Sequence, residues 1–255
     1  MSENGYTPDE MMTIAAARKL RNGDVCFVGI GKPSAAANLA RTTHAPDVVL
    51  IYESGTIGAK PDILPLSIGD GELAETADTV VSVPEIFRYW LQGGRVDIGF
   101  LGAAQIDKFA NLNTTVIGEY RKPKVRLPGA GGAPEIATSA KQVWIIIKQS
   151  KRTFVEKLDF TTSSCSLHNA YDNKGPTTVI TDLGIFVSHP ETRELTLAAV
   201  HPGVTVQRVK ESTSWDLKVS DELGQTPEPT EPELARLRDL YARTAAAHGS
   251  ATEGE

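Results

Sequence analysis

The sequence has few cysteines and no obvious set of metal ligands. Only two of its 255 residues are cysteines, Cys26 and Cys165, which is too few for a disulfide framework and typical of a reducing compartment. A chain of this length can bury most of its unfolded surface and so fold without disulfides or a structural metal. The five histidines show no pairing with metal-ligand spacing. We therefore expect no bound metal.

Long hydrophobic runs and an excess of positive charge are also missing. The longest strongly apolar runs, such as residues 48–52 and 143–147, have the length of strands rather than of membrane spans. The N-terminus lacks the basic and apolar regions of a signal peptide. Its 26 basic and 32 acidic side chains give a net charge of −6, which disfavours a broad nucleic-acid surface. We expect a soluble, cytoplasmic α/β protein that binds neither membranes nor nucleic acid.

What the chain does contain is an alternation of short apolar segments and helical patterns. A helix is expected to start at Pro8, because Thr7 can cap it and proline fits the first helical position. Further helices are predicted over residues 34–42, 84–92 and 231–247, and strands over residues 24–28, 48–52, 96–101, 143–148, 177–181 and 195–200. The alternation predicts a mostly parallel sheet covered by helices. The expected organisation is a frayed N-terminus (1–10), one domain (11–222), a linker and terminal helix (223–247) and a disordered tail (248–255).

Two glycine loops are expected to follow strands of this sheet. The first contains Gly29 and Gly31, and it lacks the third glycine of a dinucleotide fingerprint. On its residues alone it fits a tight strand-to-helix turn equally well. The second has three glycines within four residues and no Gly-Lys-Ser/Thr ending, so it can offer several backbone N–H groups to an anion without being a nucleoside-triphosphate loop. Its candidate residues are Gly129, Gly131, Gly132 and Ala133.

Glu53 is a candidate for chemistry because of its place at the end of a predicted strand. It follows an apolar strand, so its carboxylate is expected at the rim of a buried sheet, where partial desolvation raises basicity and nucleophilicity. Ser54 and Gly55 follow it and let a substrate approach the backbone closely. Gln105, also after a strand, either offers its amide to a substrate carboxylate or is a satisfied loop residue. On residues alone, Glu53 can equally be a helix cap or a solvated loop acid.

Other patterns in the sequence give weaker support for a functional site. No Gly-x-Ser-x-Gly elbow occurs, so a serine hydrolase is unsupported. Cys165 and His168 lie three residues apart in a polar stretch, which favours an incidental pair over a catalytic dyad. The basic run over residues 121–126 is interpreted as a solvated face, or as a surface that attracts phosphate groups of an anionic cofactor near the second glycine loop.

Taken in order, these segments resemble the β subunits of class I coenzyme A transferases, over about residues 11–215. Glu53-Ser54-Gly55 is similar to the glutaconate and 3-oxoadipate type, and residues 64–70 and 83–90 look closest to the 3-oxoadipate type. The other matching segments are Gly29-Ile30-Gly31, Gly102 to Asp107, Asn111 to Asn113, Gly129 to Ala133, Phe154 to Asp159, Val179 to Gly184 and His201 to Gly203. Residues 163–174 depart from the resemblance, because relatives are rich in Gly and Arg there.

The resemblance implies a mechanism and a partner. Glu53 would be the nucleophile that forms an acyl-glutamyl anhydride and then a glutamyl-CoA thioester, and the two glycine loops would stabilise the oxyanions. Coenzyme A would be substrate and covalent intermediate, with no permanently bound cofactor. An α subunit would complete the enzyme, with succinyl-CoA and 3-oxoadipate, or another short dicarboxylic or 3-oxo acid, as substrates. A CoA-ester hydrolase on the same scaffold, or a non-catalytic subunit, remains an alternative.

Overall fold

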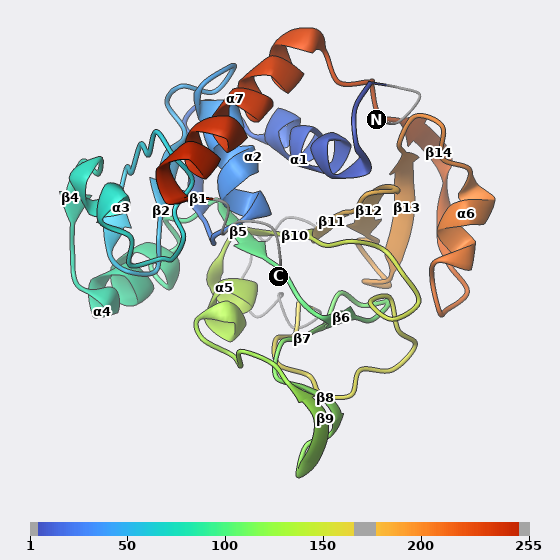
Figure 1. Cartoon of the computed structure of the whole chain (residues 1–255). Helices are drawn as coiled ribbons and strands as arrows, with labels where there is room; N and C mark the ends of the chain where they lie inside the picture. Colours follow the sequence, from blue (N-terminus) through green and yellow to red (C-terminus); the bar gives the residue numbers. More distant parts are fainter. Residues whose placement is uncertain (1–4, 166–176, 250–255) are drawn as a thin grey trace. The chain divides into compact units, whose positions relative to one another are not determined.

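The computed structural model describes residues 5–165 and 177–249. Its internal contacts group the chain into two compact units, residues 1–90 with 229–255 (unit 1) and residues 91–228 (unit 2). We describe each unit by itself. This grouping differs from the single domain over residues 11–222 that we expected, because the C-terminal helix returns to pack on the first two helices (Figure 1).

Unit 1 is built on four short strands. Strands β1 (Val25–Phe27) and β2 (Val49–Ile51) are parallel, while β3 (Thr56–Ile57) and β4 (Thr79–Val80) extend the sheet antiparallel. The helices of this unit are α1 (Pro8–Lys19), α2 (Lys32–Arg41), α3 (Gly71–Glu75), α4 (Val83–Glu85) and α7 (Glu231–His248). The predicted helix over residues 84–92 is instead a short α turn followed by the π-helix η1 (Ile86–Leu91).

The start of α1 confirms the sequence prediction in detail. The Thr7 hydroxyl accepts the Glu10 N–H at 3.1 Å, and the Glu10 carboxylate accepts the Thr7 N–H at 2.7 Å, so two of the backbone donors at the helix start are satisfied. In the last turn of α1, Arg18 donates two hydrogen bonds of 2.6 Å to Glu233, which lies in the first turn of α7. This ion pair fixes α7 against α1.

Unit 2 contains a larger sheet and two small ones. Strands β5 (Ile98–Leu101), β10 (Gln142–Ile146) and β11 (Thr178–Ile180) are parallel, β12 (Gly184–Ser188) and β13 (Leu195–Val200) continue antiparallel, and β14 (Lys218–Gln225) is parallel to β13. The small sheets pair β6 (Gln105–Ile106) with β7 (Leu112–Asn113) and β8 (Val116–Glu119) with β9 (Lys122–Arg126). The helices are α5 (Ala133–Ser139) and α6 (Val206–Glu211).

The expected parallel sheet with helical covers is therefore present, and the strands that precede Gly29 and Glu53 form one of its parallel pairs. Gln105 lies on β6 and the second glycine loop follows β9, and both of these strands belong to small antiparallel sheets. Strand β12 and the β8–β9 hairpin were not predicted. Strand β14 reaches Gln225, which places the start of the expected linker inside the sheet. Within the described residues, none of the helices is long and apolar enough to cross a membrane.

Candidate active site

Glu53 lies in the tight turn that joins β2 to β3. The turn is closed by two backbone hydrogen bonds, from the Gly55 N–H to the Tyr52 carbonyl at 3.0 Å and from the Tyr52 N–H to the Thr56 carbonyl at 3.1 Å. Glu53 and Ser54 occupy the turn and are half-buried, while the residues on either side are buried. The carboxylate is thus presented at the end of a buried strand, as the sequence predicted.

The backbone of this turn accepts only glycine at its last position. Gly55 has a φ of +112°, and a Cβ at this position would lie 2.0 Å from the carbonyl oxygen of Val81. The Val81 N–H in turn donates to the Gly55 carbonyl at 2.9 Å. The turn that carries Glu53 is therefore pressed against the backbone that follows β4, which holds it in place.

The first glycine loop leaves the sheet beside the Glu53 turn. Phe27 pairs with Ile51 in the parallel β1–β2 ladder, and the Val28 N–H donates to the Ile51 carbonyl at 2.8 Å. Because the carboxyl ends of parallel strands meet at one edge of a sheet, the loop with Gly29 and Gly31 and the turn with Glu53 emerge together. The N–H groups of both glycines have no acceptor among the described residues, so they remain able to bind an anionic group.

Two hydroxyl groups at the turn have hydrogen-bonding capacity that the described part of the chain does not use. The hydroxyls of Ser54 and Thr56 are buried and have no hydrogen-bond partner in the part of the chain that the structure describes. A buried hydroxyl without a partner costs free energy, and such groups occur at sites where a ligand supplies the missing bond. Ser54 was a candidate from the sequence, but Thr56 was not, since its burial depends on the fold.

A polar cluster under the turn was missed by sequence reasoning. Tyr52 is fully buried, and its hydroxyl lies 2.9 Å from that of Ser34 on α2. Asn38 donates to both the carbonyl and the hydroxyl oxygen of Ser34. Burial raises the pKa of Tyr52 above its usual value, so the phenol stays protonated and ties the end of β2 to α2. The available signal was a serine and an asparagine four residues apart on an alanine-rich helix.

The second glycine loop belongs to unit 2, and it is fixed at its start. The Gly129 N–H donates to the Thr114 carbonyl at 2.8 Å, and the Thr114 hydroxyl donates to the Gly129 carbonyl at 2.7 Å. At its end, the Ala133 N–H donates to the Ala130 carbonyl at 3.0 Å. The N–H groups of Gly129 and Ala133, both expected to bind an anion, therefore already donate to carbonyl groups of the protein.

The middle of this loop stays open. Gly131 has a φ of +48°, and a Cβ placed there would have no atom within 4 Å. Gly132 precedes α5 as its N-cap, and neither of these two residues has a backbone acceptor among the described residues. Of the four candidate donors in the loop, Gly131 and Gly132 are the two that the structure leaves able to bind a ligand.

Gln105 is a satisfied structural residue. Its side-chain oxygen accepts from the Asn113 amide at 2.7 Å and from the Asp159 N–H at 3.1 Å, and its amide donates to the Asp159 carboxylate at 3.0 Å. The side chain is buried, with 7% of its surface exposed. The structure thus engages the Gln105 side chain within the fold, as the alternative of a loop glutamine with satisfied bonds describes.

Two other features carry no site. Burial, with a smaller contribution from Asp107, raises the pKa of the Cys165 thiol to about 12, which makes it a poor nucleophile. His168 and the rest of the atypical segment through residue 174 lie outside the described residues.

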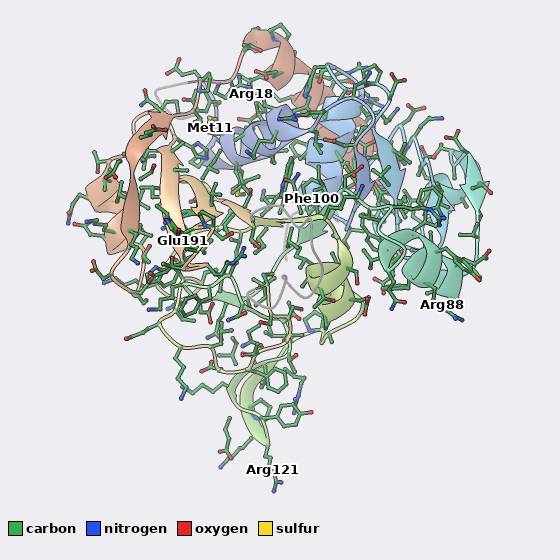
Figure 2. All side chains as sticks on the ribbon, turned by 180° about the vertical axis from the view of Figure 1, so that it is seen from behind. Met11, Arg18, Arg88, Phe100, Arg121 and Glu191 are labelled. Atoms are coloured by element: carbon green, nitrogen blue, oxygen red, sulfur yellow. The ribbon has the colours of Figure 1, made fainter. Side chains whose placement is uncertain are left out.

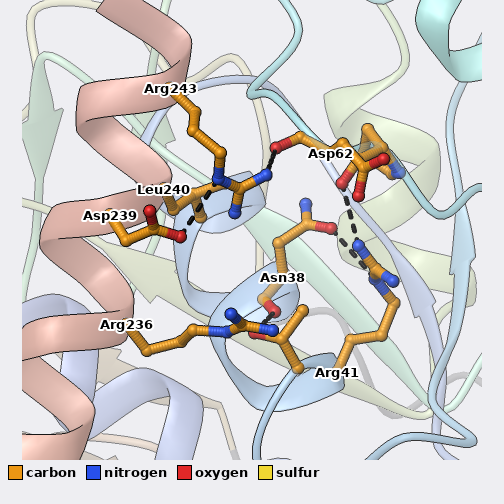
Figure 3. A pocket seen from close by; sticks show the side chains of 9 residues that line it. Asn38, Arg41, Asp62, Arg236, Asp239, Leu240 and Arg243 are labelled. Atoms are coloured by element: carbon orange, nitrogen blue, oxygen red, sulfur yellow. Dashed lines mark hydrogen bonds and ion pairs between the residues drawn. The ribbon is translucent and has the colours of Figure 1, made fainter.

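A hollow of about 390 Å³ between α2 and α7 is lined by three arginines and two aspartates (Figure 3). None of the predicted site residues lines it. It opens at the C-terminal end of α2, whereas the loop with Gly31 precedes the N-terminal end.

Comparison with known proteins identifies the class. Residues 9–212 match the family described as Coenzyme A transferase, and the chain belongs to this family. It is 63% identical to a 3-oxoadipate CoA-transferase subunit of Pseudomonas knackmussii over 96% of this chain and 97% of that protein. It is 35% identical to a glutaconate CoA-transferase subunit of Acidaminococcus fermentans over 91% of each chain.

A solved structure agrees with this assignment. The crystal structure of glutaconate coenzyme A-transferase from Acidaminococcus fermentans superposes with a TM-score of 0.85 at 31% identity, covering 92% of this chain and 94% of that one. The resemblance inferred from the ordered motifs and the predicted fold class are thus confirmed.

Proposed function

We propose that this chain is the β subunit of a CoA transferase that works with an α subunit. The reaction moves coenzyme A from an acyl-CoA to a short dicarboxylic or 3-oxo acid. We propose succinyl-CoA as the acyl-CoA and 3-oxoadipate as the acid. The name of the relative that is 63% identical supports the acid, and the fact that this relative is itself one subunit of an enzyme supports the partner. The observation that carries the proposal is the Glu53 turn, with unpartnered hydroxyls beside it and free N–H groups on the adjoining glycine loop.

In this reaction the Glu53 carboxylate attacks the thioester carbonyl and expels CoA as a thiolate, which leaves an acyl-glutamyl anhydride. The thiolate then attacks the glutamyl carbonyl, forms an enzyme–CoA thioester and releases the first acid. A carboxylate of the second acid attacks this thioester and expels the CoA thiolate, which leaves a second acyl-glutamyl anhydride. The thiolate then attacks the acyl carbonyl of this anhydride, which forms the new acyl-CoA and releases the Glu53 carboxylate. No water or redox partner is consumed.

Each step passes through a tetrahedral oxyanion that needs hydrogen-bond donors. The N–H groups of Gly29 and Gly31 supply them in unit 1, and those of Gly131 and Gly132 are the free donors of unit 2. Removing one such donor typically costs about 3 kcal/mol of transition-state stabilisation. The Ser54 hydroxyl, buried without a partner among the described residues, is a further donor beside the nucleophile.

The test uses the complex of both subunits. Succinyl-CoA followed by borohydride should convert Glu53 to the corresponding alcohol, and hydroxylamine should convert it to a hydroxamate, both detected by peptide mass spectrometry. Glu53→Asp should lower kcat by at least about 100-fold, because it withdraws the nucleophile by one methylene. Glu75→Asp, the same change on an exposed residue of α3, should leave kcat unchanged.

Three results would count against the proposal. An unlabelled Glu53 with an active complex, or full activity in Glu53→Asp, would make the chain a non-catalytic subunit. Release of CoA from succinyl-CoA without any acceptor acid would assign a hydrolase instead.

A further inference from the structure

The β8–β9 hairpin of unit 2 lies outside the larger sheet of that unit. The two strands pair only with each other and project away from the other strands of the unit (Figure 1). An isolated two-stranded hairpin is marginally stable in water. Val125 exposes 50% and Tyr120 54% of its surface. The hairpin therefore presents apolar as well as polar surface to its surroundings.

Contacts at one side of the hairpin hold it in a defined position. Tyr120 stacks on Phe160 with ring centroids 5.4 Å apart, and the Arg126 guanidinium lies 5.1 Å from the Tyr120 ring centre. Arg126 also donates to the Tyr120 carbonyl, and the Gly118 N–H donates to the Asp159 carboxylate at 3.0 Å. These contacts involve one cation of the hairpin and leave the others available.

The remaining cations are Arg121, Lys122 and Lys124. All three are exposed, and none of their side chains has a hydrogen bond or ion pair to another described residue. Arg121 lies at the outer end of the hairpin (Figure 2). Residues 119–126 carry four positive charges and one negative charge, whereas the whole chain has a net charge of −6. The hairpin is thus a projecting, positively charged element of a chain whose net charge is negative.

We propose that the β8–β9 hairpin is a docking arm that inserts into an acidic surface of the α subunit. The inference rests on the proposed function, which requires such a subunit. A projecting arm fits a protein partner better than a small ligand, because small-molecule sites are concave. Exposed tyrosine and arginine are enriched at protein interfaces, and positive charge on the arm steers it to a negative surface.

A simpler explanation accounts for only part of the hairpin. Lysine and proline on an exposed strand prevent pairing with other chains, and β9 contains Lys122, Pro123 and Lys124. Protection of an edge does not require exposed Tyr120 and Val125 side chains, which add apolar area. The arm also continues directly into the glycine loop that starts at Gly129, so docking would place that loop next to the partner.

The experiment reverses the three free cations in the co-expressed complex. Arg121→Glu/Lys122→Glu/Lys124→Glu should raise the dissociation constant between the subunits at least about 10-fold, measured by analytical ultracentrifugation at about 0.15 M salt. The wild-type complex should weaken as salt is raised, because the interaction is screened. Val125→Ser, which changes no charge, should weaken association by a smaller factor.

The matched control is Lys151→Glu/Arg152→Glu/Lys210→Glu, which reverses three exposed cations elsewhere in unit 2. It should leave the dissociation constant unchanged. Unaltered association of the hairpin variant overturns the proposal, whatever the fate of the proposed function. A hairpin variant that associates normally also overturns the proposal if it loses activity with succinyl-CoA but keeps activity with succinyl-pantetheine. That result would assign the hairpin to binding the nucleotide phosphates of CoA. Absence of any wild-type complex would instead refute the proposed function.

Discussion

Two glycines of the molecule, Gly55 in the Glu53 turn and Gly131 in the second glycine loop, serve different purposes. In the Glu53 turn of unit 1, Gly55 is required because the Val81 carbonyl occupies the space where a Cβ would stand. In the loop of unit 2, Gly131 has empty space at the same place, with no atom within 4 Å. The first glycine lets the protein pack against itself, whereas the second leaves room for something that is not part of this chain.

This contrast separates two tasks in the proposed reaction. A nucleophile has to be held still, since small displacements of a reacting group cost large factors in rate. A loop that binds an oxyanion has to present free N–H groups to a substrate that comes and goes. The two regions can be told apart by how substitutions divide their effects between stability and activity.

The largest effect is expected from Gly55→Ala. The new Cβ would lie 2.0 Å from the Val81 oxygen at a φ of +112°, and we expect the free energy of unfolding to fall by more than about 3 kcal/mol in urea denaturation. Gly23→Ala is the matched control, because Gly23 has a φ of +85° and nothing within 4 Å. It should cost only about 1–2 kcal/mol. Equal losses would show that the contact with Val81 does not hold the turn.

Gly131→Ala should affect activity more than stability. Its φ of +48° costs about 1–2 kcal/mol for a residue with a side chain, but no clash follows. We expect kcat/KM to fall at least about 10-fold, because the methyl group occupies space that the substrate uses. Gly94→Ala, with a φ of +70° and the same open surroundings, should lose as much stability and keep its activity. Full activity in Gly131→Ala would remove the second loop from the site.

Ser54→Ala tests the unpartnered hydroxyl at the Glu53 turn. Because the Ser54 hydroxyl has no partner among the described residues, its removal should leave the free energy of unfolding within about 0.5 kcal/mol of wild type. Activity should fall several-fold if substrate supplies the missing bond. Ser34→Ala provides the contrast, since it leaves the buried Tyr52 hydroxyl without its bond and should cost about 1–3 kcal/mol. A stability loss in Ser54→Ala would mean that the hydroxyl has a structural partner.

The smallest effect is expected from Cys165→Ala. The pKa of this thiol is raised to about 12 by burial and by Asp107, so the thiol stays protonated at neutral pH. We expect kcat within about twofold of wild type, and no reaction of the native thiol with a disulfide reagent at about pH 8. Rapid modification with loss of activity would show that unit 2 supplies a nucleophile as well as unit 1.

Much of the local structure of unit 1 could be predicted from residues that are close together in the sequence. The start of α1 depends on Thr7, Pro8 and Glu10, which lie within one turn, and the placement of Glu53 follows from an apolar strand that ends just before it. The order of the motifs along the chain is enough to identify the family. These predictions succeeded because capping, turn formation and strand burial are decided over a few residues.

Other features were decided only when distant segments met. Gln105 becomes structural because Asp159, 54 positions along the chain, satisfies its amide. The C-terminal helix joins unit 1 because Glu233 pairs with Arg18 across 215 positions. Burial of Cys165 and the isolation of the β8–β9 hairpin likewise depend on which strands pair.

The sequence by itself therefore determined the class of protein, the nucleophile candidate and the local form of the strands and turns around it. The tertiary structure alone decided which glycines are locked and which N–H groups remain free, because those properties depend on atoms that the chain brings near from far along its length.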